Sequence, residues 1–501
     1  MNVVVRKGSI VDAPVDAIVV NLFQGVKRPG GATGAVDKAL GGLISELIAS
    51  GEIRGKLNEF TLIHTQGKIP PRRVAVVGLG EREKFDLYRV QQVSGTAARE
   101  LDKRRCRRVA TIVHGAGVGG IDPPQAARMV ADGAIRATFR LDTHKTKKDD
   151  DRGPFLEELI IYEVDEAKAR AMRPEVRRGA IIAEAANWAR WLANEPANVM
   201  TPARLASEAR KMAREVGLSV SVLTEKQMAE RKMNLLLAVG QGSAHPPRLI
   251  VLRYNGGRRG DPPLAFVGKG VTFDTGGVSL KSREGMEQMK ADMAGAAAVL
   301  GAMRAIAQLK PRLNVIGIAP AVENAVDGAA YRPGDVLVAA NGKTVEVIST
   351  DAEGRMILAD ALHYAVEQKA ERIVDVATLT GGILVTLGPV ATGIMGNDQQ
   401  FIDQVIAAGE AQCERMWPLP LFPEYDDLMD SEIADLKNAA GRNAHSIQGA
   451  IFLREFVGEA KWVHLDIAST DYQPENKPYL PKGETGVAVR TLVELAQRLA
   501  G

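Results

Sequence analysis

Cysteine is scarce, because the chain of 501 residues contains only Cys106 and Cys413. Two cysteines cannot build a disulfide framework, which is consistent with a protein of the reducing cytoplasm. Neither residue lies in a motif that indicates covalent catalysis, so no cysteine nucleophile is expected.

Long apolar runs and a signal peptide are also missing. Asp, Arg, Lys or Gly-Pro pairs interrupt each apolar stretch before it is long enough to span a bilayer. Residues 1–7 resemble a first strand and lack the apolar run and small-residue cleavage site of a secretory signal. We therefore expect a cytoplasmic protein without a membrane partner.

Histidine is infrequent, and none of the seven histidines belongs to an HExxH pair. A thermolysin-like zinc site is thereby excluded, because such a site needs two histidines on one helix. We expect each histidine to be a packed or surface residue rather than a metal ligand. The formal net charge of +3 is too small to dictate a partner.

The length predicts more than one domain, and a hydrophobic content of 46% can supply large cores. Strand-like segments at 15–21 and 74–80 alternate with a helical segment at 89–101. This alternation predicts a small α/β domain at the N-terminus.

A change of composition marks the end of this first domain. A polar connector at 145–154 precedes a strand at 159–162, and a helix at about 174–192 leads into the remaining chain. We predict the boundary near 168, which gives domains of 1–168 and 169–501.

The segment 349–355, Ser-Thr-Asp-Ala-Glu-Gly-Arg, places two carboxylates and a guanidinium in one short turn. A strand is expected at 345–348, after an Asn-Gly hairpin signal, and a helix from about Met356. Asp351 and Glu353 alternate as strand residues do, so both carboxylates could meet one cation. Acidic residues before a helix often only cap it, and this alternative stays open for the segment taken alone.

A second charged segment lies upstream of the first. A buried strand predicted at 264–268 precedes a glycine-rich stretch that contains two lysines and Asp274. Asp292 follows, on a helix predicted from about 285 to 309. The carboxylates thus fall where strands end and helices begin, which is where open α/β sheets bind ligands.

Four carboxylates without a suitable histidine are typical of an oxygen-rich metal site. Such ligation suits Mg or Mn and tolerates Zn. Shared carboxylates can also bridge two ions roughly 3.5–4 Å apart. The sequence therefore predicts a site for divalent metal.

Four motifs carry a more specific signal, and they are VGKGVTFDTGG, SLK, MKADMAGAAAVLG and TDAEGR. They resemble the metal and catalytic motifs of the leucyl aminopeptidase family, the two-metal cytosolic aminopeptidases. Similar segments occur at 194–198, 375–382 and 462–468, so the resemblance covers about the last three hundred residues densely. The joint spacing of several rare motifs argues against chance agreement.

The resemblance implies a macro-like N-terminal α/β domain and a larger catalytic α/β domain with a central mixed sheet flanked by helices. It also implies two ions (Mn, Zn or Mg), bridged by two of the carboxylates. The implied metal ligands are Lys269, Asp274, Asp292, Asp351 and Glu353, with Asp274 and Glu353 as the bridges.

Lys269 is an unusual ligand, because an ammonium has no lone pair and only the neutral amine can bind metal. A neighbouring dication would lower its pKa and make this possible. A solvated lysine at a strand end is the alternative.

The resemblance further implies a metalloaminopeptidase that releases leucine or other apolar residues from the amino terminus of short peptides. A water bridging the two metals would attack the peptide carbonyl. Lys281 would stay protonated and stabilise the negative charge that develops. Arg355 would bind a bicarbonate that moves the proton, because a guanidinium cannot act as a base. A salt bridge from Arg355 to a nearby carboxylate is its compatible alternative.

Substrate contacts rest on weaker matches. Met289, Thr378 and Gly381 match family positions that line the pocket for the first side chain, and Leu379 could offer a backbone contact to the intermediate. The chain departs from the family pattern at Ser349, where an asparagine is usual. It departs again at 445–450, where His-Ser-Ile-Gln-Gly-Ala replaces smaller residues.

Two expectations concern partners. The resemblance implies a homohexamer whose active sites face an inner cavity that admits short peptides. The basic run 103–108 raises a DNA-binding or regulatory role as the alternative function. We favour the alternative that this run is a solvated helix-to-strand edge whose positive charge is balanced by nearby acidic residues. The net charge is nearly neutral, and no interleaved aromatic residues accompany the run.

Overall fold

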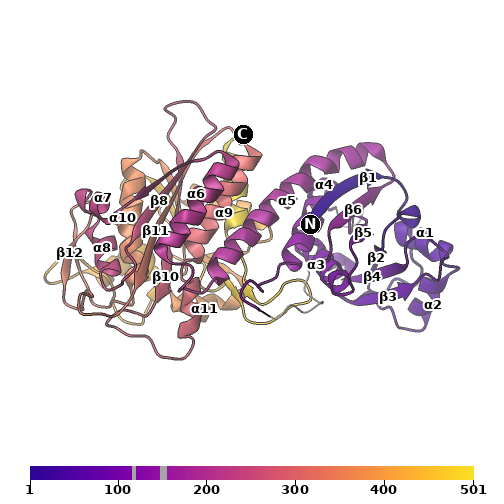
Figure 1. Cartoon of the computed structure of the whole chain (residues 1–501), viewed down its shortest axis with the longest axis horizontal. Helices are drawn as coiled ribbons and strands as arrows, with labels where there is room; N and C mark the ends of the chain where they lie inside the picture. The colour runs from indigo at the N-terminus through magenta and orange to yellow at the C-terminus, as the bar shows by residue number, and fades with distance from the viewer. Residues whose placement is uncertain (116–119, 147–154) are drawn as a thin grey trace. The chain divides into compact units, whose positions relative to one another are not determined.

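The computed structural model describes residues 1–115, 120–146 and 155–501, whose helices and strands appear in Figure 1. These residues form two compact units. The N-terminal unit comprises Met1–Glu184 and Pro474–Lys482, and the C-terminal unit comprises Ala185–Gln473 and Gly483–Gly501. No helix among the described residues has the length and apolar character needed to cross a membrane.

Helix α5 (Glu166–Asn194) connects the two units in sequence. The linker helix predicted at about 174–192 lies inside α5, and Pro174 is an internal residue of the helix. The units divide within α5, after Glu184, whereas the predicted boundary at 168 falls near its start. The boundary at 168 therefore stays a prediction. Of the predicted polar connector, residues 147–154 lie outside the described residues.

The N-terminal unit is built on a six-stranded sheet of order β1-β6-β5-β2-β4-β3. All neighbouring strands are parallel except β3 and β4, which run antiparallel. The strands are β1 (Asn2–Lys7), β2 (Ala17–Phe23), β3 (Phe60–His64), β4 (Arg73–Gly80), β5 (Arg108–Thr111) and β6 (Glu158–Glu163). Their Val- and Ile-rich sequences suit a sheet buried by helices.

The helices of this unit include a closely packed pair, α3 and α4. At Gly133 of α4, an added Cβ would come within 2.2 Å of the Gln91 carbonyl oxygen, so only glycine allows this approach. Asp86 and Asp122 begin the two helices by accepting a backbone N–H of the first turn. The helices are α1 (Gly31–Ala39), α2 (Leu43–Ala49), α3 (Leu87–Lys103) and α4 (Pro123–Ala137).

The C-terminal unit contains a nine-stranded mixed sheet, which confirms the predicted central sheet. Its order is β16-β15-β18-β14-β9-β11-β8-β7, with β10 paired to β11. The middle strands β18, β14, β9 and β11 are parallel, whereas β8 and β15 run antiparallel to their inner neighbours. The strands are β7 (Ser219–Leu223), β8 (Arg248–Asn255), β9 (Leu264–Gly268), β10 (Gly270–Asp274), β11 (Asn314–Asn324), β14 (Arg372–Ala377), β15 (Thr392–Gly396), β16 (Met416–Pro418) and β18 (Lys461–Asp466).

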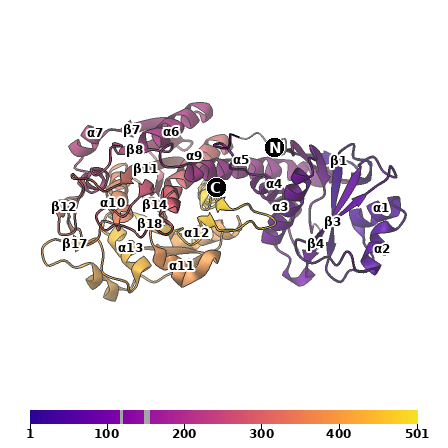
Figure 2. The same cartoon turned by 60° about the horizontal axis from the view of Figure 1, so that its bottom comes forward.

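Helices cover both faces of this sheet, as the alternation along β11 demonstrates. At Gly317 an added Cβ would meet Met303 and Val299 of α9 (Ala294–Leu309). The flanking Ile316 and Ile318 point the other way and belong to a core cluster that contains the apolar face of α10 (Glu353–Glu367). Helix α9 also packs beside α6 (Pro202–Val216), as Figures 1 and 2 show.

The C-terminal unit contains further helices besides α6, α9 and α10. They are α7 (Glu225–Glu230), α8 (Asn234–Gly240), α11 (Gly381–Leu387), α12 (Gln399–Glu410), α13 (His445–Arg454) and α14 (Val489–Leu499).

The predicted helix from about 285 to 309 is wrong in its first part. A 3-10 helix, η3 (Met286–Ala291), precedes Asp292, and α9 begins only at Ala294. Asp292 thus lies at the junction of two helices, where its side chain turns toward Lys269. We attribute the interruption of the helix to this ion pair with Lys269, which is distant in the sequence. The spacing of apolar residues within the segment contains no signal of such a contact.

The predicted strand at 345–348 and the helix from about Met356 also need correction. The hairpin is confirmed, because β12 (Val336–Val338) and β13 (Thr344–Glu346) pair antiparallel. However, β13 ends at Glu346, and α10 begins at Glu353. Asp351 and Glu353 therefore do not alternate along a strand. They occupy a turn, closed by a bond from the Ala352 N–H to the Ser349 carbonyl, and the first residue of a helix.

Candidate metal centre

The predicted ligands come from three segments that meet beside the ends of β9 and β10. Lys269 lies between β9 and β10, and Asp274 ends β10. Asp292 follows η3, while Asp351 and Glu353 lead into α10. The fold thus brings together five residues that are spread over more than eighty positions of the sequence. This is the strand-end location that the sequence predicted.

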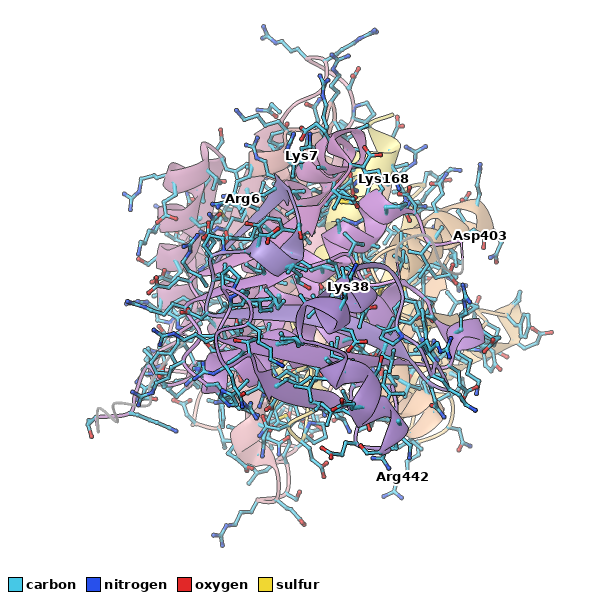
Figure 3. The ribbon with its side chains drawn as sticks, turned by 90° about the vertical axis from the view of Figure 1, so that its right-hand side faces the viewer. Arg6, Lys7, Lys38, Lys168, Asp403 and Arg442 are labelled. Atoms are coloured by element: carbon cyan, nitrogen blue, oxygen red, sulfur yellow. The ribbon has the colours of Figure 1, made fainter. Side chains whose placement is uncertain are left out.

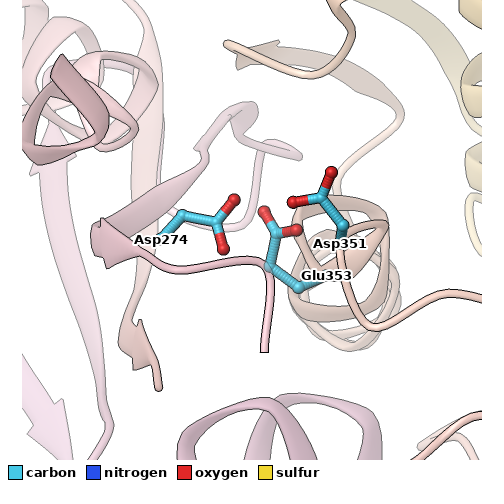
Figure 4. A group of neighbouring side chains, drawn as sticks. All are labelled: Asp274, Asp351 and Glu353. Atoms are coloured by element: carbon cyan, nitrogen blue, oxygen red, sulfur yellow. The ribbon is translucent and has the colours of Figure 1, made fainter. Parts of the chain in front are cut away.

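Three of these carboxylates form a compact group that could hold a cation. One oxygen each of Asp274, Asp351 and Glu353 lie within 4.8 Å of one another, and Figure 4 shows the three side chains pointing inward. Asp274 and Glu353 are buried, whereas Asp351 is exposed. Oxygen donors at this spacing suit a hard divalent cation.

Lys269 occupies the buried side of the centre. Its ammonium lies 2.7 Å from Asp292 Oδ1 and 2.9 Å from Glu353 Oε1. It also donates a hydrogen bond of 2.9 Å to the Thr378 carbonyl oxygen. Although burial opposes its charged form, the carboxylates of Asp292 and Glu353 hold the pKa of Lys269 above its usual value. Without metal, therefore, Lys269 acts as a counter-ion.

Lys281 occupies the open side of the centre. Its ammonium lies 2.8 Å from Asp274 Oδ2 and 2.5 Å from Asp351 Oδ1. Burial opposes its charge as well, but the carboxylates, Asp274 first, raise its pKa. Without metal, Lys281 is therefore protonated at neutral pH, and its predicted role in stabilising negative charge stays a prediction.

The charges of the centre fit a divalent cation. Burial raises the pKa of Asp292 well above its usual value and raises that of Asp274, and Glu353 adds to both effects. Asp292 Oδ2 is buried and has no hydrogen-bond partner among the described residues. Four carboxylates face two ammonium groups, so the centre carries an excess of negative charge that bound cations would neutralise.

The Asp274 carboxylate is held in place by a hydrogen-bond network that the sequence did not reveal. Its Oδ1 accepts bonds of 2.8 Å from the Asn324 side chain and from the Gly276 N–H. Asn324 also donates to the Thr350 carbonyl, and the Thr350 hydroxyl donates to the Gly276 carbonyl. Gly277 has φ of +63°, and a Cβ there would lie 2.8 Å from Thr350 Oγ1. The glycines thus let the two charged segments meet.

Arg355 lies behind the carboxylates and is 2% exposed. Its Nη1 donates to the Asn438 carbonyl at 2.8 Å, and its buried Nε has no hydrogen-bond partner among the described residues. Burial lowers its pKa to about 10, which leaves the guanidinium charged at neutral pH. No ion pair joins it to Asp351 or Glu353 in the described part of the chain. A buried cation with an unused donor fits a small anion such as bicarbonate.

The predicted substrate residues lie on the loop after β14 and on η3. Thr378 and Leu379 are half-buried, and Gly381 is exposed at the start of α11. The Thr378 hydroxyl donates to Asp292 Oδ1 at 2.7 Å, which ties this loop to the centre. Met289 is half-buried in η3, one turn before Asp292.

Asp466 is a further residue that the sequence did not single out. Its buried carboxylate accepts the N–H groups of Leu379 and Thr380 and, at 2.6 Å, the Thr380 hydroxyl. It therefore fixes the loop that carries the predicted substrate contacts. Two signals in the sequence were its position at the end of the apolar strand β18 and its place in the segment 462–468, which resembles the family.

The two departures from the family pattern lie in different places. The Ser349 hydroxyl accepts the Asp351 N–H at 3.2 Å, while Asn438 bonds the Ser349 backbone on both its N–H and carbonyl. His445 begins α13 beside Gly382, where an added Cβ would lie 3.0 Å from the His445 Cβ. Ser349 therefore borders the metal centre, whereas His445 borders the start of α11, next to the predicted substrate residue Gly381.

Buried carboxylates and lysines at the strand ends of a mixed α/β sheet define a metal-dependent hydrolase of the α/β class. The chain belongs to the cytosol aminopeptidase family, since residues 187–493 match its catalytic domain and residues 19–148 its N-terminal domain.

Similar proteins cover nearly the whole chain. A probable cytosol aminopeptidase of Solibacter usitatus is 45% identical over 497 residues, which is 99% of each chain. One of Geobacter sulfurreducens is 45% identical over 459 residues, 92% of each chain. Among solved structures, a mutant of tomato leucine aminopeptidase has a TM-score of 0.88 and 32% identity, covering 99% of this chain and 96% of that one.

A second solved structure is the bottromycin maturation enzyme BotP in complex with Mn. It has a TM-score of 0.84 and 33% identity, and the match covers 97% of this chain and all of the other. The comparisons confirm the predicted family and the two-domain α/β fold. The chain is accordingly a peptidase of a metal-dependent family.

Proposed function

We propose that the protein is an aminopeptidase that uses two divalent ions to release apolar residues, leucine above all, from the amino terminus of short peptides. The observation that carries this proposal is the pair of lysines, one buried and one partly exposed, each of which contacts two carboxylates of one cluster. The proposed metal ligands are Lys269, Asp274, Asp292, Asp351 and Glu353, with Asp274 and Glu353 shared by both ions.

Lys269 can serve as a ligand if it loses one proton. A neutral amine has two N–H groups and one lone pair. It could keep the bond to the Thr378 carbonyl, which lies 2.9 Å away, while its lone pair faces a cation. The carboxylates that favour its ammonium form would then be engaged by metal, which removes the cause of the raised pKa.

Bound divalent ions would supply Lewis-acid polarisation of the peptide carbonyl and lower the pKa of a water molecule. Lys281 would stabilise the negative charge that develops on the carbonyl oxygen, because its ammonium is fixed between Asp274 and Asp351. Arg355 would hold a bicarbonate that accepts the proton from the attacking water. Thr378, Leu379 and Gly381, with Met289, would position the peptide.

The free amino group of the substrate distinguishes an aminopeptidase from an endopeptidase. We expect metal-free enzyme to hydrolyse leucine p-nitroanilide after addition of Mn, Zn or Mg, and to leave N-acetyl-leucine p-nitroanilide intact. No hydrolysis with any metal would overturn the proposed activity, and equal hydrolysis of both compounds would overturn the aminopeptidase assignment.

We also propose a cytoplasmic location and a homohexameric assembly. Light scattering, which measures the molar mass in solution, would test the homohexamer. DNA binding through the basic run remains the less favoured alternative. Lys103 and Arg104 pair with Glu100, while Arg107 and Arg108 pair with acidic residues that precede and begin β6. These ion pairs support a balanced surface edge rather than a phosphate-binding strip.

A further inference from the structure

The N-terminal unit contains a charged cavity of about 670 Å³ that has no part in the proposed peptidase chemistry. Its walls come from the end of α3, from residues 137–145 at and after the end of α4, and from the segment Pro474–Lys482. All of these residues belong to the same compact unit. The volume is typical of sites for small molecules, which range over roughly 300–1,000 Å³.

Cationic side chains predominate in the walls of this cavity. Five cationic residues line it, namely Arg99, Lys103, Arg140, Lys145 and Lys482. Two acidic residues, Asp102 and Asp142, also line it. Asp102 is buried, accepts the backbone N–H groups of Phe155 and Leu156, and pairs with Arg140 at 2.6 Å. Its charge is therefore largely engaged within the protein.

Arg99 contacts a neutral acceptor in the wall of the cavity. Its Nη2 donates to the Asn476 side-chain oxygen at 2.7 Å, which is a neutral acceptor. Burial lowers the pKa of Arg99, the nearby Arg140 cation lowers it further, and Glu100 opposes this. However, Glu100 already forms ion pairs of 2.6 Å with Lys103 and with the following arginine. An anion in the cavity would relieve the repulsion between the two guanidinium groups.

Asn476 connects the two sides of the cavity. Besides accepting the bond from Arg99, its side-chain oxygen accepts the Lys482 N–H at 3.2 Å. The segment that contributes Lys482 is thereby fixed against α3. Gly95 of α3 allows this contact, because a Cβ there would lie 2.9 Å from the Tyr479 carbonyl oxygen. The cations are thus held on a formed wall rather than on a free tail.

We propose that this cavity binds a phosphorylated small molecule that carries at least two negative charges, through Arg99, Arg140 and Lys482. Guanidinium groups match phosphate oxygens with two parallel hydrogen bonds, and the excess of cations calls for a multiply charged anion. A nucleic acid strand fits less well, because the neighbouring basic residues Arg104 and Arg107 are paired with acids and give no continuous path for a phosphate backbone.

The test is calorimetric titration of the metal-loaded full-length protein with inorganic tripolyphosphate, in a fixed excess of Mg²⁺. The variant R99Q/K482Q removes two cations of the cavity. The matched control R6Q/K38Q removes one arginine and one lysine elsewhere on the same unit, at positions labelled in Figure 3. Binding of tripolyphosphate at the metal centre is common to all three proteins and cancels in the comparison.

We expect R99Q/K482Q to weaken binding by about tenfold or more, whereas the control should retain the affinity of the parent protein. No binding beyond that at the metal centre, or equal weakening in both double variants, would overturn the proposal. A single-stranded oligonucleotide that binds more tightly than tripolyphosphate, and loses this affinity in R99Q/K482Q, would overturn the small-molecule assignment. Thermal unfolding of each variant checks that the cavity has folded.

Discussion

The two lysines of the metal centre make the same kind of contact in different surroundings. Each ammonium lies between two carboxylates, but the Lys269 side chain is 4% exposed and the Lys281 side chain 24% exposed. The partners differ as well, since Asp292 and Glu353 are buried while Asp351 is 39% exposed. A buried ion pair resists separation because each unpaired charge would be strongly destabilising, whereas water can replace a partner at the open side.

This difference assigns separate tasks to the two sides of the centre. On the buried side, Lys269 also donates a hydrogen bond to the Thr378 carbonyl, and the Thr378 hydroxyl donates to Asp292. The loop after β14, the lysine and Asp292 are therefore linked to one another. On the open side, the Lys281 ammonium is accessible to a molecule entering from solvent. The comparison therefore predicts that the buried side governs metal retention and stability, and that the open side governs turnover.

The largest effect is expected for Glu353→Gln, because Glu353 contacts Lys269 and also faces Asp274 and Asp351. Gln keeps the size of the side chain but removes the negative charge that both sides of the centre use. We expect kcat/KM to fall by about a thousandfold or more, with loss of bound metal measured by elemental analysis.

Glu367→Gln is the matched control, since Glu367 ends the same helix and is exposed. Its ion pairs with Arg231 and His363 are at the surface and contribute little. Full metal content and activity in Glu353→Gln would show that the carboxylate cluster is not the metal centre.

The two lysines themselves give the most direct test of the comparison. In metal-free protein, Lys269→Met leaves two buried carboxylates without their cation, and we expect the free energy of unfolding to fall by about 3–5 kcal/mol. Lys281→Met should cost less than Lys269→Met, because only one of its two carboxylate partners, Asp274, is buried and water can reach the other. With metal, Lys281→Met should instead lower kcat by about a hundredfold or more.

Tryptophan fluorescence during urea unfolding can measure these stabilities selectively. The four tryptophans all lie in the C-terminal unit, at Trp188, Trp191, Trp417 and Trp462. The fluorescence therefore reports the unit that contains the centre. Equal losses of stability for the two lysine variants would contradict the assigned difference between the buried and open sides.

Substitution of Arg355 tests whether this third cation contributes to turnover independently of the two lysines. We expect Arg355→Ala to lower kcat by about a hundredfold while metal stays bound, because in the described part of the chain Arg355 donates to the Asn438 carbonyl and forms no hydrogen bond with a proposed metal ligand. Arg355→Lys should recover little activity, since an ammonium cannot reproduce the planar fork of donors. Loss of metal in Arg355→Ala would assign the residue to the structural support of the carboxylates.

The sequence indicated the charged residues of the centre, but it did not indicate the hydrogen-bond partners that fix their side chains. Asp274 ends β10, Asp351 lies just before α10 and Glu353 begins α10, so all three lie at the strand and helix ends where local patterns placed them. By contrast, Asn324 bonds Asp274 from 50 positions away. An isolated asparagine has no neighbours in sequence that reveal such a partner.

The structure around Asp292 also depends on a contact that the local sequence pattern does not reveal. Apolar spacing predicted one helix through this residue, yet the helix breaks there because the carboxylate turns toward Lys269. Similarly, the segment Pro474–Lys482 joins the N-terminal unit although it lies near the end of the chain. Both features depend on contacts between distant residues, which periodicity within a short window does not contain.

The last expected effect extends the comparison to a buried carboxylate that has no ion pair among the described residues. Asp360 in α10 accepts the N–H groups of Leu236 and Ala340, and burial raises its pKa to about 7. In the unfolded chain an aspartate has a pKa of about 3.9. Between these values the folded state keeps a proton that the unfolded state has lost, so stability falls as pH rises from about 4 to 7 and then levels.

We expect the free energy of unfolding to decrease by about 1–3 kcal/mol more in the parent protein than in Asp360→Asn between pH 5 and pH 7. Asn cannot ionise, so the variant should show a flatter dependence on pH. The control is Asp403→Asn, an exposed residue of α12 labelled in Figure 3, which should retain the slope of the parent. Parallel curves for the parent and Asp360→Asn would mean that hydrogen bonds alone stabilise the charge of Asp360, and that a buried carboxylate here needs no cation.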